Sequence, residues 1–216
     1  MPNKYSQEKR ILNDFTNGLW KNNPLLSAGL CVASAVFVTT ALKNGLALCV
    51  GLLFVTIPAI ILNCLLLAKV PAFLRFPICF FLGSFMLIPA SFVIAPLSPD
   101  IFDSLGIFLP LLAINAVTFS RVNEFEGSGK LLPSLMDAVG CCLGFSGVIL
   151  LMSAVREVIG HKTIFSYPIG FITTGIPGFL LPFAGFIFLG FLAAIFNKVN
   201  MRSPRGHNKN HAAPRH

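Results

Sequence analysis

The chain has 216 residues, of which 55% are hydrophobic and only 11% are charged, and its formal net charge is +8. Soluble domains carry roughly 25% charged residues, so this composition excludes an ordinary soluble protein and is typical of a membrane protein. No soluble domain remains to form a folded basic surface. We therefore expect the 16 Lys and Arg residues to set topology and contact membrane lipid, and we expect no nucleic-acid partner.

Six charge-poor segments follow one another along the chain. A helix needs about 20 apolar residues, within a range of about 17–25, to cross the hydrocarbon core of a bilayer. Because backbone groups in lipid must be hydrogen-bonded internally, the segments predict helices. The sequence thus predicts an all-α membrane protein with six transmembrane helices, of which the first and fourth are short or re-entrant, at about residues 25–42, 45–68, 76–97, 104–120, 135–159 and 172–196.

These helices divide the chain into a membrane domain and two flanking regions. Residues 1–24 are predicted as a cytoplasmic N-terminal segment, residues 25–196 as the six-helix membrane domain, and residues 197–216 as a disordered cytoplasmic tail. A polar loop at 123–134 separates two three-helix repeats at about 25–97 and 104–196. An odd number of helices in each half means that the second repeat runs inverted to the first, as in many transporters.

The distribution of basic residues predicts the orientation. Most of them precede the first helix, follow the sixth, or lie in the loops on the same side of the membrane as the two ends. The opposite side receives Lys43, Arg156 and Lys162. Short cytoplasmic loops carry an excess of Lys and Arg, so both termini are predicted in the cytoplasm.

Two stretches far apart in the chain carry a family pattern. Residues 18–31 contain Gly-Leu-Trp-Lys-Asn-Asn-Pro followed by Gly-Leu-Cys, and residues 105–121 contain Leu-Gly-Ile-Phe-Leu-Pro followed by Asn-Ala-Val-Thr-Phe-Ser-Arg. Together they resemble the E subunit of Rnf electron transport complexes and the homologous D subunit of the sodium-translocating NADH:quinone oxidoreductase. The resemblance extends over about residues 15–196, and the Leu-Gly-Ile-Phe-Leu-Pro stretch favours the Rnf side.

The resemblance implies a membrane subunit of an ion-translocating oxidoreductase complex, which couples electron transfer to Na⁺ or H⁺ translocation in the bacterial inner membrane. It implies the other Rnf subunits as partners, chiefly the homologous A subunit, and no catalytic activity of this chain alone. Two alternatives stay open. One is a small secondary transporter with inverted repeats, and the other is a cluster-free scaffold protein within the same complex.

The resemblance also implies a cofactor site at Cys31. In the related subunits the matching cysteine is a ligand of a 2Fe–2S cluster shared with a homologous subunit, and each of the two provides two thiolates, the soft ligands that such clusters need. The second ligand position here is Ala116, whose methyl group cannot bind iron. Three alternatives follow: a substitute ligand completes the cluster, another cysteine such as Cys64, Cys141 or Cys142 reaches the site, or the cluster is lost. Without a cluster, Cys31 is an ordinary small buried residue.

Five charged residues are candidates for an ion path or for structural roles. Asp137, near the start of the fifth helix, is the acid most suited to an ion path, and the alternative is a helix N-terminus where the dipole favours a carboxylate. Arg121 and Glu124 follow the fourth helix, as a cytoplasmic ion entrance or a solvated helix end. Arg156 and Glu157 suit subunit docking, an ion exit or a membrane-border anchor. Adjacent residues on a helix do not face each other, so we expect this last pair to have separate partners.

Overall fold

The computed structural model describes residues 15, 16, 19, 23, 25, 26, 29, 31–65, 70–97, 105, 106, 108–112, 115–124, 131–165, 167, 168 and 175–202. In chain order the elements are α2 (Val32–Val38), α3 (Leu42–Leu65), α4 (Ala72–Ile94), η3 (Ala95–Leu97), α6 (Phe108–Leu111), α7 (Ala116–Glu124), α8 (Leu131–His161), β1 (Thr163–Ile164), β2 (Tyr167–Pro168), η5 (Pro177–Leu180) and α9 (Pro182–Arg202). The predicted tail beyond residue 202 and most of the predicted N-terminal segment lie outside the described residues.

The described chain is almost entirely helical, which confirms the predicted class. Four helices are long and apolar enough to cross a membrane, namely Leu42–Leu65, Pro77–Ile94, Leu131–His161 and Pro182–Asn200. They correspond to the second, third, fifth and sixth predicted helices. The number six and the inverted repeat stay predictions, because the first and fourth helices are represented by short pieces.

Those two predicted helices are interrupted. In place of a helix at 25–42, the chain turns at Leu25 and Leu26, forms the seven-residue α2, and breaks again at residues 39–41 before α3. In place of a helix at 104–120, the four-residue α6 and the nine-residue α7 are separate, with Asn115 between them. Hydropathy alone merges such pieces, because it registers apolar composition and not the positions where the backbone turns.

The sixth helix also begins later than predicted. The segment expected to form its start contains the 3₁₀ turn η5, and α9 begins only at Pro182. Two prolines explain this. Pro177 and Pro182 each lack a backbone N–H and fix φ, which suits the first turn of a helix and not its interior. Between α8 and η5 lies a short antiparallel hairpin in which Thr163 pairs with Pro168 and Ile164 pairs with Tyr167.

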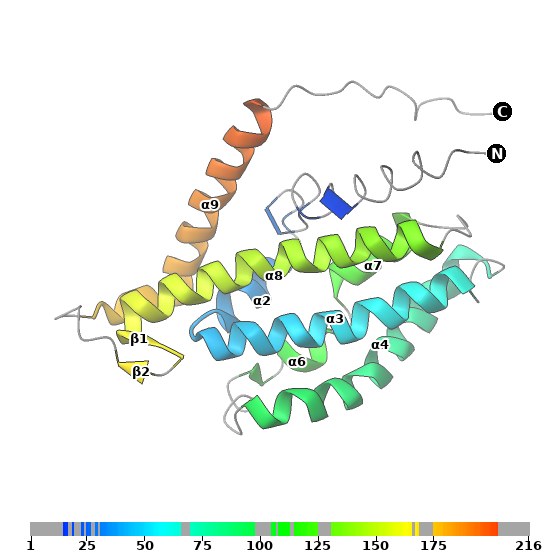
Figure 1. Ribbon diagram of the computed structural model, residues 1–216, viewed down its shortest axis with the longest axis horizontal. Helices are drawn as coiled ribbons and strands as arrows, with labels where there is room; N and C mark the ends of the chain where they lie inside the picture. The colour runs from blue at the N-terminus through cyan, green and yellow to red at the C-terminus, as the bar shows by residue number, and fades with distance from the viewer. Residues whose placement is uncertain are drawn as a thin grey trace.

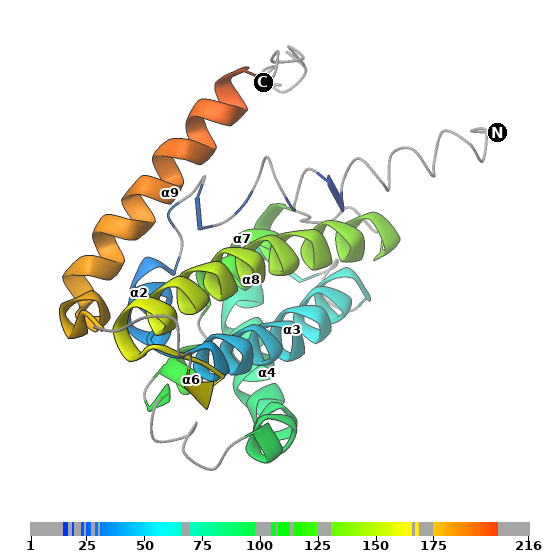
Figure 2. The same cartoon turned by 60° about the vertical axis from the view of Figure 1, so that its left-hand side comes forward.

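The antiparallel pair of α3 and α8 forms the centre of the molecule (Figure 1). The two helices approach closely at Gly45, where an added Cβ would collide with the Ser153 hydroxyl. The helix α4 packs along the other side of α3, and α9 diverges from the bundle in both views (Figure 2). The main hydrophobic core joins side chains of α2, α3, α7 and α8, including Val36, Leu48 and Phe145. The two short helices are therefore held inside the molecule by the long ones.

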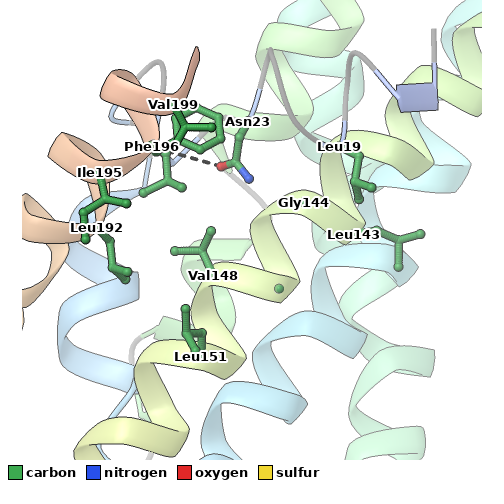
Figure 3. A pocket seen from close by; sticks show the side chains of 12 residues that line it. Leu19, Asn23, Leu143, Gly144, Val148, Leu151, Leu192, Ile195, Phe196 and Val199 are labelled. Atoms are coloured by element: carbon green, nitrogen blue, oxygen red, sulfur yellow. Dashed lines mark hydrogen bonds between the residues drawn. The ribbon is translucent and has the colours of Figure 1, made fainter. Parts of the chain in front are cut away.

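The glycines of α8 define a second surface. An added Cβ at Gly140 would lie 2.5 Å from the Phe15 carbonyl oxygen, and one at Gly144 would lie 2.6 Å from the Leu19 carbonyl oxygen, so the N-terminal residues pack directly on this face. One turn further lies an apolar cavity of about 350 Å³ between α8 and α9 (Figure 3). Gly147 lines this cavity, and no described atom lies within 4 Å of the Cβ position there.

Candidate functional site

The N-terminal ends of α2 and α7 meet at a hydrogen bond between side chains. The Cys31 thiol donates to Asn115 Oδ1 over 2.9 Å, across 84 positions of sequence. Cys31 is half-buried and takes the left-handed conformation at φ 58° directly before α2, and its carbonyl oxygen accepts from the Ala35 N–H at 3.0 Å. The two stretches that carry the family pattern are thus in contact at this point.

Asn115 organises the start of α7. Its side-chain oxygen accepts from the Val117 N–H at 2.8 Å, and its backbone carbonyl accepts from the Phe119 N–H at 3.1 Å. This is the arrangement of an N-cap residue, for which Asn is among the preferred types. Asn115 is only 5% exposed, and its Oδ1 accepts from both Val117 and Cys31. One carbonyl oxygen therefore fixes the helix start and the thiol together.

Contacts with neighbouring elements hold the two short helices in place. The Thr56 and Thr118 hydroxyls lie 2.8 Å apart and join α3 to α7 inside the core. The rings of Phe37 and Phe108 stack with centroids 5.6 Å apart and join α2 to α6. The site is therefore built by elements from both halves of the sequence.

The donors at this site do not fit the half-site that the resemblance implies. A cluster held by four thiolates between two subunits needs two soft sulfur ligands from each. Here Cys31 offers one, and the neighbouring Ala116 offers a methyl group. The oxygen that Cys31 contacts belongs to the Asn115 amide. As a metal ligand it would be hard and neutral, and it already accepts a hydrogen bond from the Val117 N–H. Within the described residues there is no group of three or more His, Cys, Asp or Glu side chains that could hold a metal ion.

The other cysteines have surroundings of their own. Cys64 packs against a small separate cluster that contains Ile60 and Cys79. The Cys141 thiol lies 3.9 Å from Asp137 Oδ2, one helical turn away on α8. Cys142 is buried in the main core. None of these described contacts brings one of the proposed substitute thiols to Asn115.

The structure gives Arg156 a set of oxygen partners. The side chain is 0% exposed. Its guanidinium donates to the carbonyl oxygen of Val36 and, at 2.8 Å, to Thr39 Oγ1, both at the C-terminal end of α2. It also donates to the η5 segment, where it contacts the carbonyl oxygens of Phe179 at 3.3 Å and Leu180 at 2.6 Å. A buried cation is here surrounded by backbone and hydroxyl oxygens.

Glu157 points to a different set of partners. Its Oε2 accepts from the Leu42 N–H, the first residue of α3, at 2.6 Å, and its Oε1 accepts from the Thr163 hydroxyl at 3.1 Å. It is 2% exposed. The carboxylate therefore joins the start of α3 to the hairpin that follows α8.

The remaining charged candidates are placed differently. Asp137 is 5% exposed and lies in the second turn of α8, which begins at Leu131. Because the helix dipole acts within the first turn, the explanation of Asp137 as a favourable N-terminal carboxylate does not hold. Arg121 and Glu124 belong to the last turns of α7, and their side chains lie outside the described part of the structure.

Asn115 belongs to the second family stretch, but it was not among the predicted site residues. An Asn directly before a helix is a capping signal, and that signal identifies it. Thr56 was missed, because nothing local marks a hydroxyl whose partner is far away in sequence.

Known proteins resemble this chain along most of its length. The model of the family described as "Rnf-Nqr subunit, membrane protein" matches residues 11–193. Two relatives, from Shewanella frigidimarina and Shewanella oneidensis, are 30% and 29% identical over 86% of this chain and 86% of their own length. A third, from Methanosarcina acetivorans, is 26% identical over 79% of each chain, and all three are named as the E subunit of an ion-translocating oxidoreductase complex. The chain belongs to the Rnf-Nqr family of membrane subunits.

Proposed function

We propose that this chain is the E-type integral membrane component of an Rnf-type ion-translocating oxidoreductase complex, and that the complex couples electron transfer to Na⁺ or H⁺ translocation. The observation that carries the proposal is the extent of similarity. The family match covers residues 11–193, and relatives named as E subunits align over 79–90% of this chain.

The proposed architecture is six membrane segments in two inverted three-helix repeats. Each proposed repeat begins with a short interrupted segment, α2 in the first and α6 with α7 in the second, and continues with two long helices. The first long helix of each repeat, α3 and α8, pairs with the other at the centre of the molecule. Transporters with inverted repeats place their working sites at such interrupted helices.

The proposed setting is the bacterial inner membrane, with both termini in the cytoplasm. The partners are the other subunits of the complex, and the homologous A subunit is the chief one because it would complete an inverted pair. The 2Fe–2S cluster shared with that partner stays a prediction. The proposed function does not require this chain to supply two cluster ligands, since Ala116 occupies the second ligand position. A substitute ligand, another cysteine or loss of the cluster would each account for that substitution.

A purification experiment tests the proposal. An affinity tag on this chain should co-purify a membrane complex that contains its homologous A-type subunit and the redox subunits, identified by mass spectrometry. Deletion of the chain should abolish the redox-driven ion movement of membrane vesicles. Recovery of the chain alone, together with ion transport by the isolated chain in liposomes, would instead identify a small secondary transporter and would refute the proposed function.

A further inference from the structure

The break between α2 and α3 leaves helix ends inside the protein. The helix α2 ends at Val38, α3 begins at Leu42, and residues 39–41 form turns between them. The last carbonyl groups of one helix and the first N–H groups of the next have no partners within their own helices. Thr39 and Asn44 are buried here, so water cannot freely satisfy these groups.

Arg156 binds the carbonyl side of the break, where the Thr39 hydroxyl donates to Ala35 O and the Thr40 N–H donates to Val38 O. Its guanidinium binds Val36 O and Thr39 Oγ1, where the helix dipole is negative, and its second amino group binds Leu180 O. The contact is closed off by α9, because a Cβ at Gly185 would lie 3.2 Å from Arg156 Nη1. A buried charge persists in a membrane protein only when it is well paired, and these oxygens provide the pairing.

Glu157 satisfies the amide side of the same break through the Leu42 N–H. Consecutive residues of a helix point about 100° apart, so two neighbours on one turn of α8 reach opposite sides of the break. A cation therefore meets the carbonyl end of α2, and an anion meets the amide end of α3. The positive Arg156 thus lies at the negative end of α2, and the negative Glu157 lies at the positive end of α3.

We propose that Arg156 and Glu157 are positioning residues for the Cys31 site. The helix α2 has seven residues, and it is held at its C-terminal end by Arg156 and at its N-terminal end by the bond between Cys31 and Asn115. When the C-terminal hold is removed, α2 can shift, and Cys31 leaves Asn115. The inference goes beyond the proposed function and needs no metal, because it concerns the geometry of the chain itself.

The alkylation rate of each cysteine in the intact complex measures whether Cys31 has left Asn115. N-ethylmaleimide is added to membranes, and mass spectrometry follows each cysteine-containing peptide. In Arg156→Met, which keeps a comparable volume without the charge, the Cys31 rate should rise about tenfold, since a hydrogen bond to a charged group is worth at least one factor of ten. Cys79 lies in a separate small cluster and should keep its rate. Cys142 is fully buried on α8 in the main core, and it should keep its rate as long as α8 itself stays in place.

Two further variants separate positioning from general loosening. Arg156→Lys keeps the charge and should recover part of the protection of Cys31. Met152→Ala empties a buried core position one turn earlier on α8 and should leave the ratio of the Cys31 rate to the Cys142 rate unchanged. An unchanged Cys31 rate in Arg156→Met, or a parallel rise at Cys79 and Cys142, would overturn the proposal.

If Arg156→Met does not accumulate in the membrane, two milder changes decide the question. Thr39→Val removes one acceptor of Arg156 at nearly constant volume, and Glu157→Gln keeps an acceptor for Leu42 and removes the charge. Both should raise the Cys31 rate selectively by a smaller factor. Equal rates in both variants and in the parent chain would overturn the proposal in the same way.

Discussion

The predicted cofactor site at Cys31 depends on position 116, where this chain has an alanine. Cys31 and Asn115 are in contact, and Ala116 follows Asn115 at the start of α7, so the backbone already brings the second family ligand position to the thiol. The resemblance implies a sulfur ligand at this position, and Ala116 has none. The present side chains make a metal-independent contact in which the thiol is a donor and the amide oxygen is an acceptor.

Restoring the sulfur tests this view. Ala116→Cys should raise the iron content of the purified complex above that of the parent chain, because it adds a second soft ligand beside Cys31. The matched control is Ala116→Ser, which has nearly the same volume and a hard oxygen, and it should leave the iron content unchanged. Iron quantification with electron paramagnetic resonance of the reduced complex gives the measurement. If the parent complex has a 2Fe–2S signal that Cys31→Ala removes, a substitute ligand completes the cluster.

At the scale of elements, α8 carries most of the architecture. It packs on α3, holds the break after α2 through Arg156 and Glu157, and presents two glycines to the N-terminal residues. The spacing of Gly140 and Gly144, four residues apart in the sequence, is typical of a helix face that another backbone approaches closely. It did not indicate the contacting backbone, which includes the carbonyl groups of Phe15 and Leu19.

Two glycines on α8 provide a matched pair of substitutions. Gly144→Ala should lower stability by about 1–3 kcal/mol, because its Cβ would lie 2.6 Å from the Leu19 carbonyl oxygen and would push the N-terminal residues away. Gly147→Ala should be neutral or stabilising by up to about 1 kcal/mol, since the position faces a cavity and alanine favours a helix. The thermal midpoint of the purified complex measures both. Equal losses in the two variants would contradict the packing seen at Gly144.

At the scale of the whole molecule, α8 and α9 determine on which sides of the membrane the hairpin and the C-terminal end of α9 lie. Each is long and apolar enough to cross the membrane once, so residues 163–168 and the C-terminal end of α9 are expected on opposite sides. With the predicted orientation, the hairpin faces away from the cytoplasm.

Introduced cysteines check this arrangement. Tyr167 is 77% exposed and Lys198 is exposed near the end of α9, whereas all six native cysteines are buried or half-buried. In spheroplasts, a membrane-impermeant maleimide should label Tyr167→Cys directly and label Lys198→Cys only after permeabilisation. The reverse pattern would invert the predicted topology, and labelling of both would contradict the crossing by α9.

The sequence by itself determined the membrane class, the four long helices and the family. Each of these depends on local composition or on short motifs, and an apolar run in lipid has few structures available to it besides a helix. It also identified both stretches that form the site. It predicted one long helix in place of α2 and its flanking turns, another in place of α6 and α7, and a start for the sixth helix that is too early. Such errors arise where a turn, a proline or a capping residue interrupts an apolar run.

Only the tertiary structure decided how these parts meet. The bond between Cys31 and Asn115 spans 84 positions, and the bond from Arg156 to Val36 spans 120. Nothing local to either residue specifies such partners, because they depend on how α2, α7 and α8 pack around one core. The sequence indicated Arg156 and Glu157 as candidates with separate partners. The packing of α8 against the end of α2 and the start of α3 supplied those partners and hence their roles, since buried charges must find complementary groups wherever the fold brings them.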